Sequence, residues 1–376
     1  MLWFSLKGFI CIMIIGIAIL AYINKVYLKD NSNFSITKIN VNSVSKLTNL
    51  KLNIDSDATN VQSSYNGDYL SFLSGGKLKF YDMNDGKSYT VSSVDNMEIM
   101  NYTWLYDRNR LLIAEKTVNT TDGRYMKMYY YSVSDNQLTE ISNTTDNIDL
   151  KFTLKAGTTL DNIKMSTLTN LVYLKFTDSK GINSVQCFNI MAQKLSLHIN
   201  SGNIGNIFPL KQTSILLHED LHYGYVYKYV LGTETDNSVK INNKKNLRLL
   251  GVDSNDNAYF APTSTSQTDN IYFGTLDDLA AGTYQTIQLP KTVDCKDITV
   301  MPDGTVYQNV KGSALIDLTN KKMMDYQGEL IGIYPGGFVA VDNMLIKSYD
   351  FSKAVPLDSS SSAISSGTSS SSTTSK

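Results

Sequence analysis

The chain has few of the residues that cross-link or rigidify a fold. Its 376 residues include three cysteines and six prolines. Cys11 lies in an apolar N-terminal run, and Cys187 and Cys295 are far apart in the sequence, so the cysteines offer no disulfide framework. The folded state must therefore be held together by side-chain packing.

An excess of charge of one sign is also missing. The formal net charge is -1, charged residues make up 18% of the chain, and no long basic run is present. Proteins that bind nucleic acid need a basic surface to neutralise phosphates. The composition therefore gives no reason to expect nucleic acid as a partner.

The residues that are abundant favour β-structure. The chain has 24 tyrosines together with many Asn, Ser, Thr and Val residues, and it lacks heptads rich in Leu or Ala. Tyr, Thr and Val suit strands, whereas Asn and Ser suit polar turns. The length is compatible with one large domain, because propellers and barrels run past ~200 residues as single units. The composition predicts an all-β protein.

One hydrophobic run stands at the N-terminus. Gly8 to Ile23 contains no charged residue, and Trp3 and Lys7 precede it, where an indole and a snorkelling ammonium suit the membrane interface. We expect a short cytoplasmic N-terminus over residues 1–7, a transmembrane signal-anchor helix over 8–24 and a juxtamembrane linker over 25–36. The protein would then be a single-pass protein of the cell membrane with its large domain outside the cytoplasm.

The run has two alternative interpretations. A cleavable signal peptide should be followed by a small-x-small site, which the sequence does not clearly contain. A buried core helix would need a helical partner, which a β domain does not offer. Flanking charge does not decide the orientation, because Lys7 on one side faces Lys25, Lys29 and Lys38 on the other.

Strand-like runs recur through the rest of the chain. Several share an ending in which an apolar, a polar and an apolar residue precede a tight polar turn and another strand. These endings are FYDMNDGKSYTV from Phe80, YYSVSDNQLTEI from Tyr130, CFNIMAQKLSLH from Cys187, LIDLTNKKMMDY from Leu315 and SYDFSKAVPL from Ser348, with looser versions near Tyr229 and Thr275. Each follows a second apolar run, at Tyr69, Arg110, Leu171, Ser214, Ala258, Thr305 and Gly337. The pattern predicts seven units built on hairpins.

Seven such units predict a seven-bladed β-propeller over residues 37–357. Their average spacing is near the ~45 residues of a propeller blade. A four-stranded unit has two apolar faces, so units bury both faces only by packing in a closed ring. The region from Thr37 to Asn60 is expected to supply a strand that completes the last blade. The alternative is a β-sandwich, or a pair of them, which would not show a consistent hairpin ending. The Ser-rich tail 358–376 has little to bury and is expected to be disordered.

The stretch SYNGDYLSFLSGGKLKFYDMNDGK, Ser64 to Lys87, resembles a blade of the TolB-like and dipeptidyl-peptidase-IV-N-terminal-like propellers. In those propellers a Ser-Pro-Asp-Gly turn leads into an inner strand, and Met301-Pro302-Asp303-Gly304 is the nearest second copy here. The resemblance is to an architecture and covers residues 40 to 357. It implies no peptidase activity, because the chain has no Gly-x-Ser-x-Gly motif and no hydrolase domain after the propeller.

One segment matches a zinc-protease signature. His218-Glu219-Asp220-Leu221-His222 has the His-Glu-x-x-His spacing, which on a helix places two imidazoles beside one another to bind zinc while the glutamate activates water. Here the segment lies between two strand-like runs, which predicts a polar hairpin tip. We therefore expect no catalytic residue, metal or cofactor, and keep as the alternative a zinc-dependent hydrolase that uses Glu219 with His218 and His222. Adventitious metal binding that involves His198 is a weaker option.

Two further patterns are weaker still. Asp253, Asn255 and Asn257 suggest a calcium loop, but the acidic ligand spacing and the terminal Glu are missing. The tyrosines at 129–131 and 223–229 suit a sugar-stacking or protein-binding face, although alternating Tyr in strands more often serves packing. We expect a non-catalytic binding or scaffold protein of the cell envelope, with a protein or glycan ligand on a propeller face or in the axial channel. A structural subunit of a membrane assembly is a further alternative.

Overall fold

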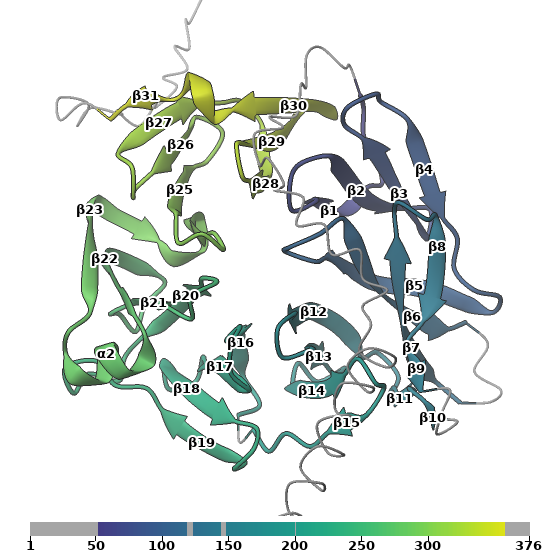
Figure 1. Cartoon of the computed structure of the whole chain (residues 1–376), viewed down its shortest axis with the longest axis horizontal. Helices are drawn as coiled ribbons and strands as arrows, with labels where there is room; N and C mark the ends of the chain where they lie inside the picture. Colours follow the sequence, from purple (N-terminus) through teal and green to yellow (C-terminus); the bar gives the residue numbers. More distant parts are fainter. Residues whose placement is uncertain (1–51, 119–122, 144–147, 200, 358–376) are drawn as a thin grey trace, which may run out of the picture. The chain divides into compact units, whose positions relative to one another are not determined.

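The computed structural model describes residues 52–118, 123–143, 148–199 and 201–357 (Figure 1). The chain divides into two units, Met1–Asn42 and Ser43–Lys376, and every described residue belongs to the second. The expected membrane segment 8–24, the linker 25–36 and the tail 358–376 lie outside the described residues. Within the described ranges no helix is both long enough and apolar enough to cross a membrane.

Seven antiparallel sheets of three or more strands follow one another along the described chain, and we call them blades 1 to 7. Blade 1 contains β1 (Thr59–Ser63), β2 (Tyr69–Ser74), β3 (Lys77–Asp82) and β4 (Ser88–Val91). Blade 2 contains β5 (Met97–Trp104), β6 (Arg110–Thr117), β7 (Tyr125–Ser132), β8 (Gln137–Glu140) and the short β11 (Phe152–Thr153). Blade 3 contains β12 (Thr159–Ser166), β13 (Leu171–Thr177), β14 (Asn183–Asn189) and β15 (Lys194–Leu195). Blade 4 contains β16 (Ile204–Pro209), β17 (Ile215–Asp220), β18 (Tyr225–Val230) and β19 (Thr235–Ser238).

The remaining blades add small variations to the same order. Blade 5 contains β20 (Arg248–Val252), β21 (Ala258–Ala261), β22 (Gln267–Gly274) and β23 (Gln285–Asp294), with helix α2 (Leu276–Ala281) between the last two strands. Blade 6 contains β24 (Ile298–Val300), β25 (Val306–Val310), β26 (Ala314–Asp317), β27 (Lys322–Asp325) and β31 (Val355–Pro356). Blade 7 contains β28 (Glu329–Tyr334), β29 (Gly337–Asp342) and β30 (Leu345–Asp350). The short elements β9 (Ser142–Asn143), β10 (Ile148–Asp149), η1 (Cys295–Asp297) and η2 (Phe351–Lys353) lie in connections.

The blades form a closed ring, as Figure 1 shows. The first strands β28, β1, β5, β12, β16, β20 and β24 are innermost, and from β28 round to β24 each contacts the next. A cluster that includes Tyr307 and Leu315 of blade 6 with Phe338 of blade 7 joins the remaining two blades. The described domain is a seven-bladed β-propeller.

Each interface between neighbouring blades has its own apolar core. Seven hydrophobic clusters are present, and each draws its buried residues from two adjacent blades. Phe80 of blade 1 packs with Tyr129 of blade 2, for example, and Leu217 of blade 4 packs with Phe260 of blade 5. Each blade buries its apolar faces only against its two neighbours. A single blade would therefore be unstable alone, and the ring must close.

The repeat pattern in the sequence located the strands well. The seven apolar runs at Tyr69, Arg110, Leu171, Ser214, Ala258, Thr305 and Gly337 all fall on the second strand of a blade. The copy at Ser348 was assigned wrongly, because β31 does not fold back on β30 but pairs with β27 of blade 6. The loose copy at Thr275 contains helix α2, which Thr275 caps by accepting a hydrogen bond from the Asp278 N–H.

Blade 7 obtains its outer strand from the start of the described chain. The Ile54 N–H donates to the Met344 carbonyl at 3.0 Å, and the Ile346 N–H donates to the Leu52 carbonyl at 2.9 Å. Asn53 and Leu345 form the antiparallel bridge between these bonds. The predicted closing strand is therefore confirmed for 52–54, while the rest of the predicted region before residue 52 lies outside the described residues.

The inner strands carry a recurrent irregularity. Six of the seven, all except β24, shift register against the second strand of the blade. Such bulges increase strand twist and redirect side chains. At two of them a glycine permits close contact with the next blade. A Cβ on Gly332 would lie 2.2 Å from the Ser63 Oγ, and one on Gly251 would lie 2.7 Å from the Val300 Cβ.

Candidate functional site

The turns that follow the inner strands gather at one end of the ring axis. All blades have the same strand order, so the turn between first and second strand lies at the same end in each. We call this surface the turn face. Its turns include Ser64–Asp68, Leu105–Asn109, Ser254–Asn257 and Met301–Gly304. The turns at Ser64 and Met301, which carry the family resemblance, thus lead out of an inner strand, whereas the resemblance implied that they lead into one.

Neighbouring turns on this face are tied together. The hydroxyls of Tyr106 and Thr167 share a hydrogen bond of 2.5 Å between blades 2 and 3. Ser166 Oγ donates to the Lys211 carbonyl at 2.9 Å between blades 3 and 4. The Ser254 N–H donates to the Pro302 carbonyl at 2.8 Å between blades 5 and 6. These links hold the turns in fixed positions around the axis.

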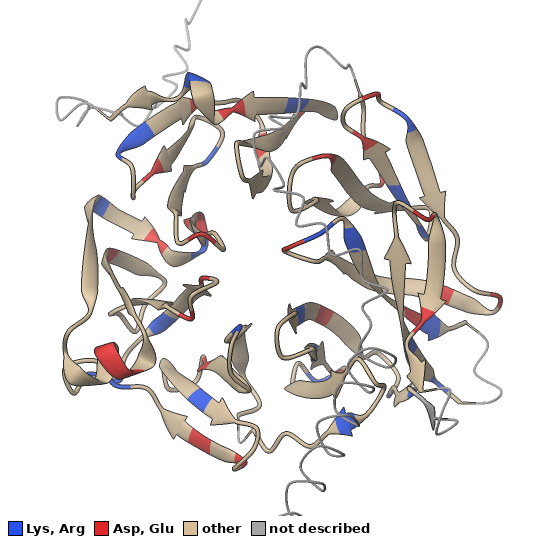
Figure 2. Cartoon of the chain, in the orientation of Figure 1, with Lys and Arg blue, Asp and Glu red and all other residues tan. Residues whose placement is uncertain are grey.

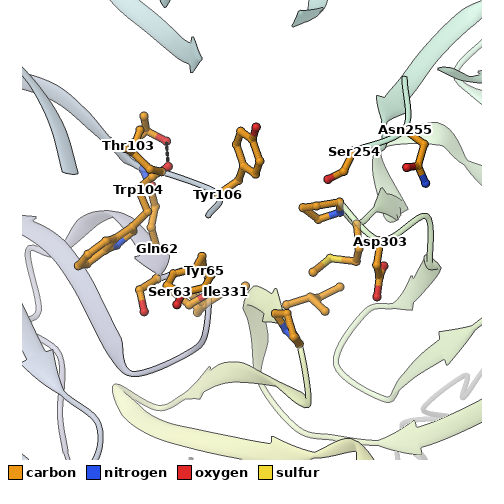
Figure 3. A pocket seen from close by; sticks show the side chains of 17 residues that line it. Gln62, Ser63, Tyr65, Thr103, Trp104, Tyr106, Ser254, Asn255, Asp303 and Ile331 are labelled. Atoms are coloured by element: carbon orange, nitrogen blue, oxygen red, sulfur yellow. Dashed lines mark hydrogen bonds between the residues drawn. The ribbon is translucent and has the colours of Figure 1, made fainter. Parts of the chain in front are cut away.

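A cavity of about 760 Å³ opens among the turns of blades 1, 2, 5, 6 and 7. Figure 3 shows Thr103, Trp104 and Tyr106 on one side of it and Ser254, Asn255 and Asp303 on the other. The apolar residues of the lining are Trp104, Leu105, Met301, Pro302, Ile331, Ile333 and Pro335. The polar residues include Gln62, Ser64, Asn255 and Asp303. A concave apolar surface with a few fixed polar groups is the usual form of a ligand site.

The aromatic wall of the cavity is fixed by hydrogen bonds. Trp104 Nε1 donates to the Ser71 Oγ at 2.8 Å, and its ring stacks on Tyr69 with centroids 5.9 Å apart. Gln62 Nε2 donates to the Tyr102 carbonyl at 3.0 Å, and the Tyr102 hydroxyl donates to the Asn60 carbonyl. Residues held in this way present a preformed surface, which lowers the entropy cost of binding a ligand.

Both signs of charge occur around the central opening, as Figure 2 shows. Asp107 accepts two hydrogen bonds from its neighbour Arg108, at 3.0 and 2.8 Å. Lys211 places its Nζ over the ring of the cavity residue Tyr106 at 4.1 Å from the centroid. Burial, together with the nearby charge of Lys164, lowers the pKa of Lys211 to about 8.

The segment with the zinc-protease spacing does not form a helix. His218, Glu219 and Asp220 are the last residues of β17, and His222 follows in the exposed turn. Consecutive strand residues point to opposite faces, so the His218 and Glu219 side chains diverge. The one-turn geometry that the zinc alternative requires is therefore not formed by these residues. Among the described residues no group of three or more His, Cys, Asp and Glu side chains is arranged to hold a metal.

Glu219 and His218 serve the packing of blade 4. The Glu219 carboxylate is buried and accepts hydrogen bonds from Arg248 Nε at 2.9 Å, the Leu249 N–H at 2.7 Å and the Asn206 N–H at 2.7 Å. It thus ties the inner strand of blade 4 to that of blade 5. The buried His218 ring has its Nε2 2.9 Å from an Asp236 carboxylate oxygen.

The suspected calcium residues form a turn that is closed by its own aspartate. Asp253 Oδ1 accepts hydrogen bonds from the Asn255 N–H at 2.8 Å and the Asn257 N–H at 2.9 Å. Its Oδ2 accepts one from Asn257 Nδ2 at 2.8 Å. The carboxylate is buried and has this structural role, so the Asp and Asn spacing reflects turn formation.

Six of the seven tyrosines at 129–131 and 223–229 are buried or half-buried. Tyr129, Tyr131 and Tyr229 are buried, and Tyr227 stacks on His218 with centroids 5.4 Å apart. Tyr223 is the exception, because 61% of its surface is exposed. His198 is exposed and lies 3.4 Å from the Glu234 carboxylate.

A buried glutamate in blade 2 predicts a pH-dependent stability. Glu115 is fully buried, its Oε2 accepts a hydrogen bond from the Val94 N–H at 3.1 Å, and its Oε1 has no partner. Burial raises the pKa of Glu115 from 4.5 to about 7. A carboxyl whose pKa rises on folding stabilises the fold fully below its unfolded pKa and loses that contribution as the pH rises through the folded pKa.

Replacement of Glu115 by glutamine should therefore stabilise the protein at pH 8 by about 2 kcal/mol relative to the unchanged chain, and by almost nothing at pH 4. Denaturant unfolding at both pH values measures the difference. Glu98→Gln, at an exposed position of the neighbouring strand β5 where Glu98 pairs with Lys116, is the matched control and should show little pH dependence. Equal behaviour of the two variants would contradict the prediction.

Sequence comparison and structure comparison give different results. No family model matches the chain, and no curated protein matches it. Among solved structures, a catalytically inactive virginiamycin B lyase from Staphylococcus aureus is 11% identical with a TM-score of 0.46, over 80% of this chain and 97% of that chain. The tricorn protease is 13% identical with a TM-score of 0.39, over 63% of this chain and 27% of that chain. Porphyromonas gingivalis dipeptidyl peptidase 4 is 9% identical with a TM-score of 0.41, over 69% of this chain and 44% of that chain.

All three TM-scores are below 0.5, so these similarities carry no conclusion about this chain. This chain covers less than half of the tricorn protease and dipeptidyl peptidase 4 chains, and the low identities carry no activity across. The resemblance to a propeller architecture that the turns at Ser64 and Met301 suggested is confirmed, and it rests on the seven sheets of this chain.

The cavity was missed in the sequence. The turn Met301–Gly304 was interpreted as a folding signal alone, and Trp104 and Tyr106 were not singled out. A signal was present, because each lining turn directly precedes one of the seven apolar runs. This pattern points to a cavity only once it is known that the turns lie on one face of the propeller.

Proposed function

We propose that this protein is a membrane-anchored, extracytoplasmic propeller that acts without catalysis as a binding or scaffold protein of the cell envelope. We further propose that a segment of a partner protein enters the axial cavity of the turn face. The cavity between Trp104, Tyr106 and Asp303 is the observation that carries the binding function.

The anchor and the location are supported by the sequence alone. Residues 8–24, extended by the mostly apolar residues Leu2 to Leu6, are long and apolar enough to span the hydrocarbon core of a bilayer. A large folded domain after such a segment is translocated largely regardless of the flanking charges. The membrane is therefore the first partner that we propose, through residues 8–24.

A protein segment suits the cavity better than a glycan does. The lining contains two isoleucines, a methionine and two prolines beside its aromatic residues, and few of its side chains carry charge. Glycan sites need many hydrogen-bonding groups for sugar hydroxyls, whereas apolar pockets with a few polar groups accept peptide side chains. A volume of about 760 Å³ has the size of an ordinary ligand pocket.

The test places a photocrosslinking amino acid at Asn255 of the full chain in living cells. Asn255 is exposed and lines the cavity, so we expect a discrete protein adduct in the membrane fraction. Protease added outside intact cells, or outside cells with a permeabilised outer layer, should degrade the adduct. Replacement of Tyr106 by alanine should reduce its yield by about tenfold, because this substitution removes one wall of the pocket.

The control carries the same crosslinker at Tyr223. This residue is exposed and aromatic and lies in the turn between the second and third strands of blade 4, at the opposite end of the axis. The same adduct from both positions, or an adduct that survives external protease, would overturn the proposal. An adduct to a glycan instead of a protein would show that the partner is a glycan and not a protein segment.

A further inference from the structure

Two lysines from neighbouring blades lie near the turn face, although neither is among the residues that line the axial cavity. Lys164 lies on the inner strand β12, and Lys211 lies in the turn after the inner strand β16. The Nζ of Lys164 lies 4.8 Å from the ring centroid of Phe208, and that of Lys211 lies 4.1 Å from the centroid of Tyr106. Tyr106 also lines the cavity, so Lys211 contacts a residue that a ligand in the cavity would contact.

The carboxylates near Lys211 are engaged by other groups. Asp107 is held by the Arg108 guanidinium through two hydrogen bonds, at 3.0 and 2.8 Å. Asp256 accepts the backbone N–H groups of Lys211 and Gln212, the latter at 3.1 Å. Within the described ranges, the lysines that form ion pairs with carboxylates, such as Lys79 and Lys127, do not include Lys164 or Lys211. Neither ammonium of the pair therefore has an acidic side chain as its direct partner.

The positive charges of Lys164 and Lys211 repel one another, and both ammonium groups are partly removed from water. Burial lowers the pKa of Lys164, and burial and Lys164 together lower that of Lys211, against the opposing effects of Asp256 and Asp107. By surface area both residues are intermediate between buried and exposed. An anion between them would supply the missing counter-charge and form charge-assisted hydrogen bonds.

We propose that Lys164 and Lys211 form an anion subsite, and that the ligand of the axial cavity combines an apolar body with a carboxylate or phosphate group. This inference rests on the proposed function, because it specifies the ligand of the same cavity. On a partner protein the anionic group would be an acidic or phosphorylated side chain next to an apolar one.

The test compares three small probes with one aromatic body. 4-Fluorobenzoate, 4-fluorophenyl phosphate and the neutral 4-fluorobenzamide are titrated against the full chain in detergent micelles by fluorine NMR, with empty micelles as the blank. At least one of the two anions should bind about tenfold more tightly than the amide. The preferred anion distinguishes a carboxylate ligand from a phosphate ligand.

Variants assign the effect to the two lysines. Lys164→Gln combined with Lys211→Gln should remove the anion preference and leave amide binding within about twofold. The exposed lysines 180 and 353, replaced together by glutamine, are the matched control and should leave the preference intact. Lys211→Gln alone should remove most of the preference if the double variant folds poorly.

The outcomes separate the inference from the proposed function. Anions that bind no more tightly than the amide, or a preference that survives in the double variant, would overturn the anion subsite. Amide binding that is lost on Tyr106→Ala would still support a ligand in the cavity. If no probe binds, the subsite is abandoned, and crosslinking from Asn255 decides the proposed function independently.

Discussion

Replacement of Glu219 by alanine is expected to lower the free energy of unfolding by about 4 kcal/mol. The carboxylate is buried and accepts hydrogen bonds from Arg248, Leu249 and Asn206, so its loss leaves two backbone donors and a guanidinium without their acceptor. Because these bonds join blades 4 and 5, the variant should unfold at lower denaturant concentration across the whole ring. Unfolding of the full chain in detergent, followed by intrinsic fluorescence, measures the change.

Two further substitutions sharpen this test. Glu219→Gln keeps an acceptor but turns an amide N–H toward donors, so about half of the loss is expected. Glu234→Ala removes an exposed glutamate next to His198 and should cost less than about 0.5 kcal/mol. Stoichiometric zinc in the purified protein, together with a hydrolytic activity that a stable Glu219→Gln variant has lost, would instead favour the zinc alternative.

Replacement of Ile54 by proline should destabilise the propeller by about 3 kcal/mol. The substitution removes the N–H that donates to Met344 in blade 7, and it removes a half-buried side chain from the cluster between blades 7 and 1. Just beyond Ile54 the chain is attached to blade 1, where the Asp55 carboxylate pairs with Lys79 at 2.6 Å. The short strand therefore connects the last blade to the first, and its loss should open the ring.

Ser56→Pro is the matched proline control. Ser56 is exposed and follows Asp55 in a turn closed by a hydrogen bond from the Ala58 N–H to the Asp55 carbonyl at 3.0 Å. Proline is favoured at the second position of such a turn, so this variant should be neutral or slightly stabilised. Denaturant unfolding compares both variants with the unchanged chain, and similar stabilities would show that closure does not depend on residues 52–54.

The zinc-like segment illustrates what spacing alone conveys. His218 and His222 have helical spacing, yet the strand-like flanks predicted a polar hairpin tip. Only Leu221 and His222 lie in the turn, because His218–Asp220 are buried residues at the end of β17. The sequence did not indicate that Glu219 accepts hydrogen bonds from two blades, since Arg248 and Leu249 lie in blade 5, whereas Glu219 lies in blade 4. The function of a buried carboxylate depends on partners that are distant along the chain.

The sequence by itself determined the kind and number of modules. Period-two apolar runs and polar turns are local features, so they identified the seven second strands and the all-β class without any knowledge of the neighbours. Only the tertiary structure decided which turns share a face, how Lys211 meets Tyr106, where β31 pairs and how 52–54 closes blade 7. These arrangements arise because each blade buries its apolar faces against others, and the register of that packing is set by contacts that no local pattern records.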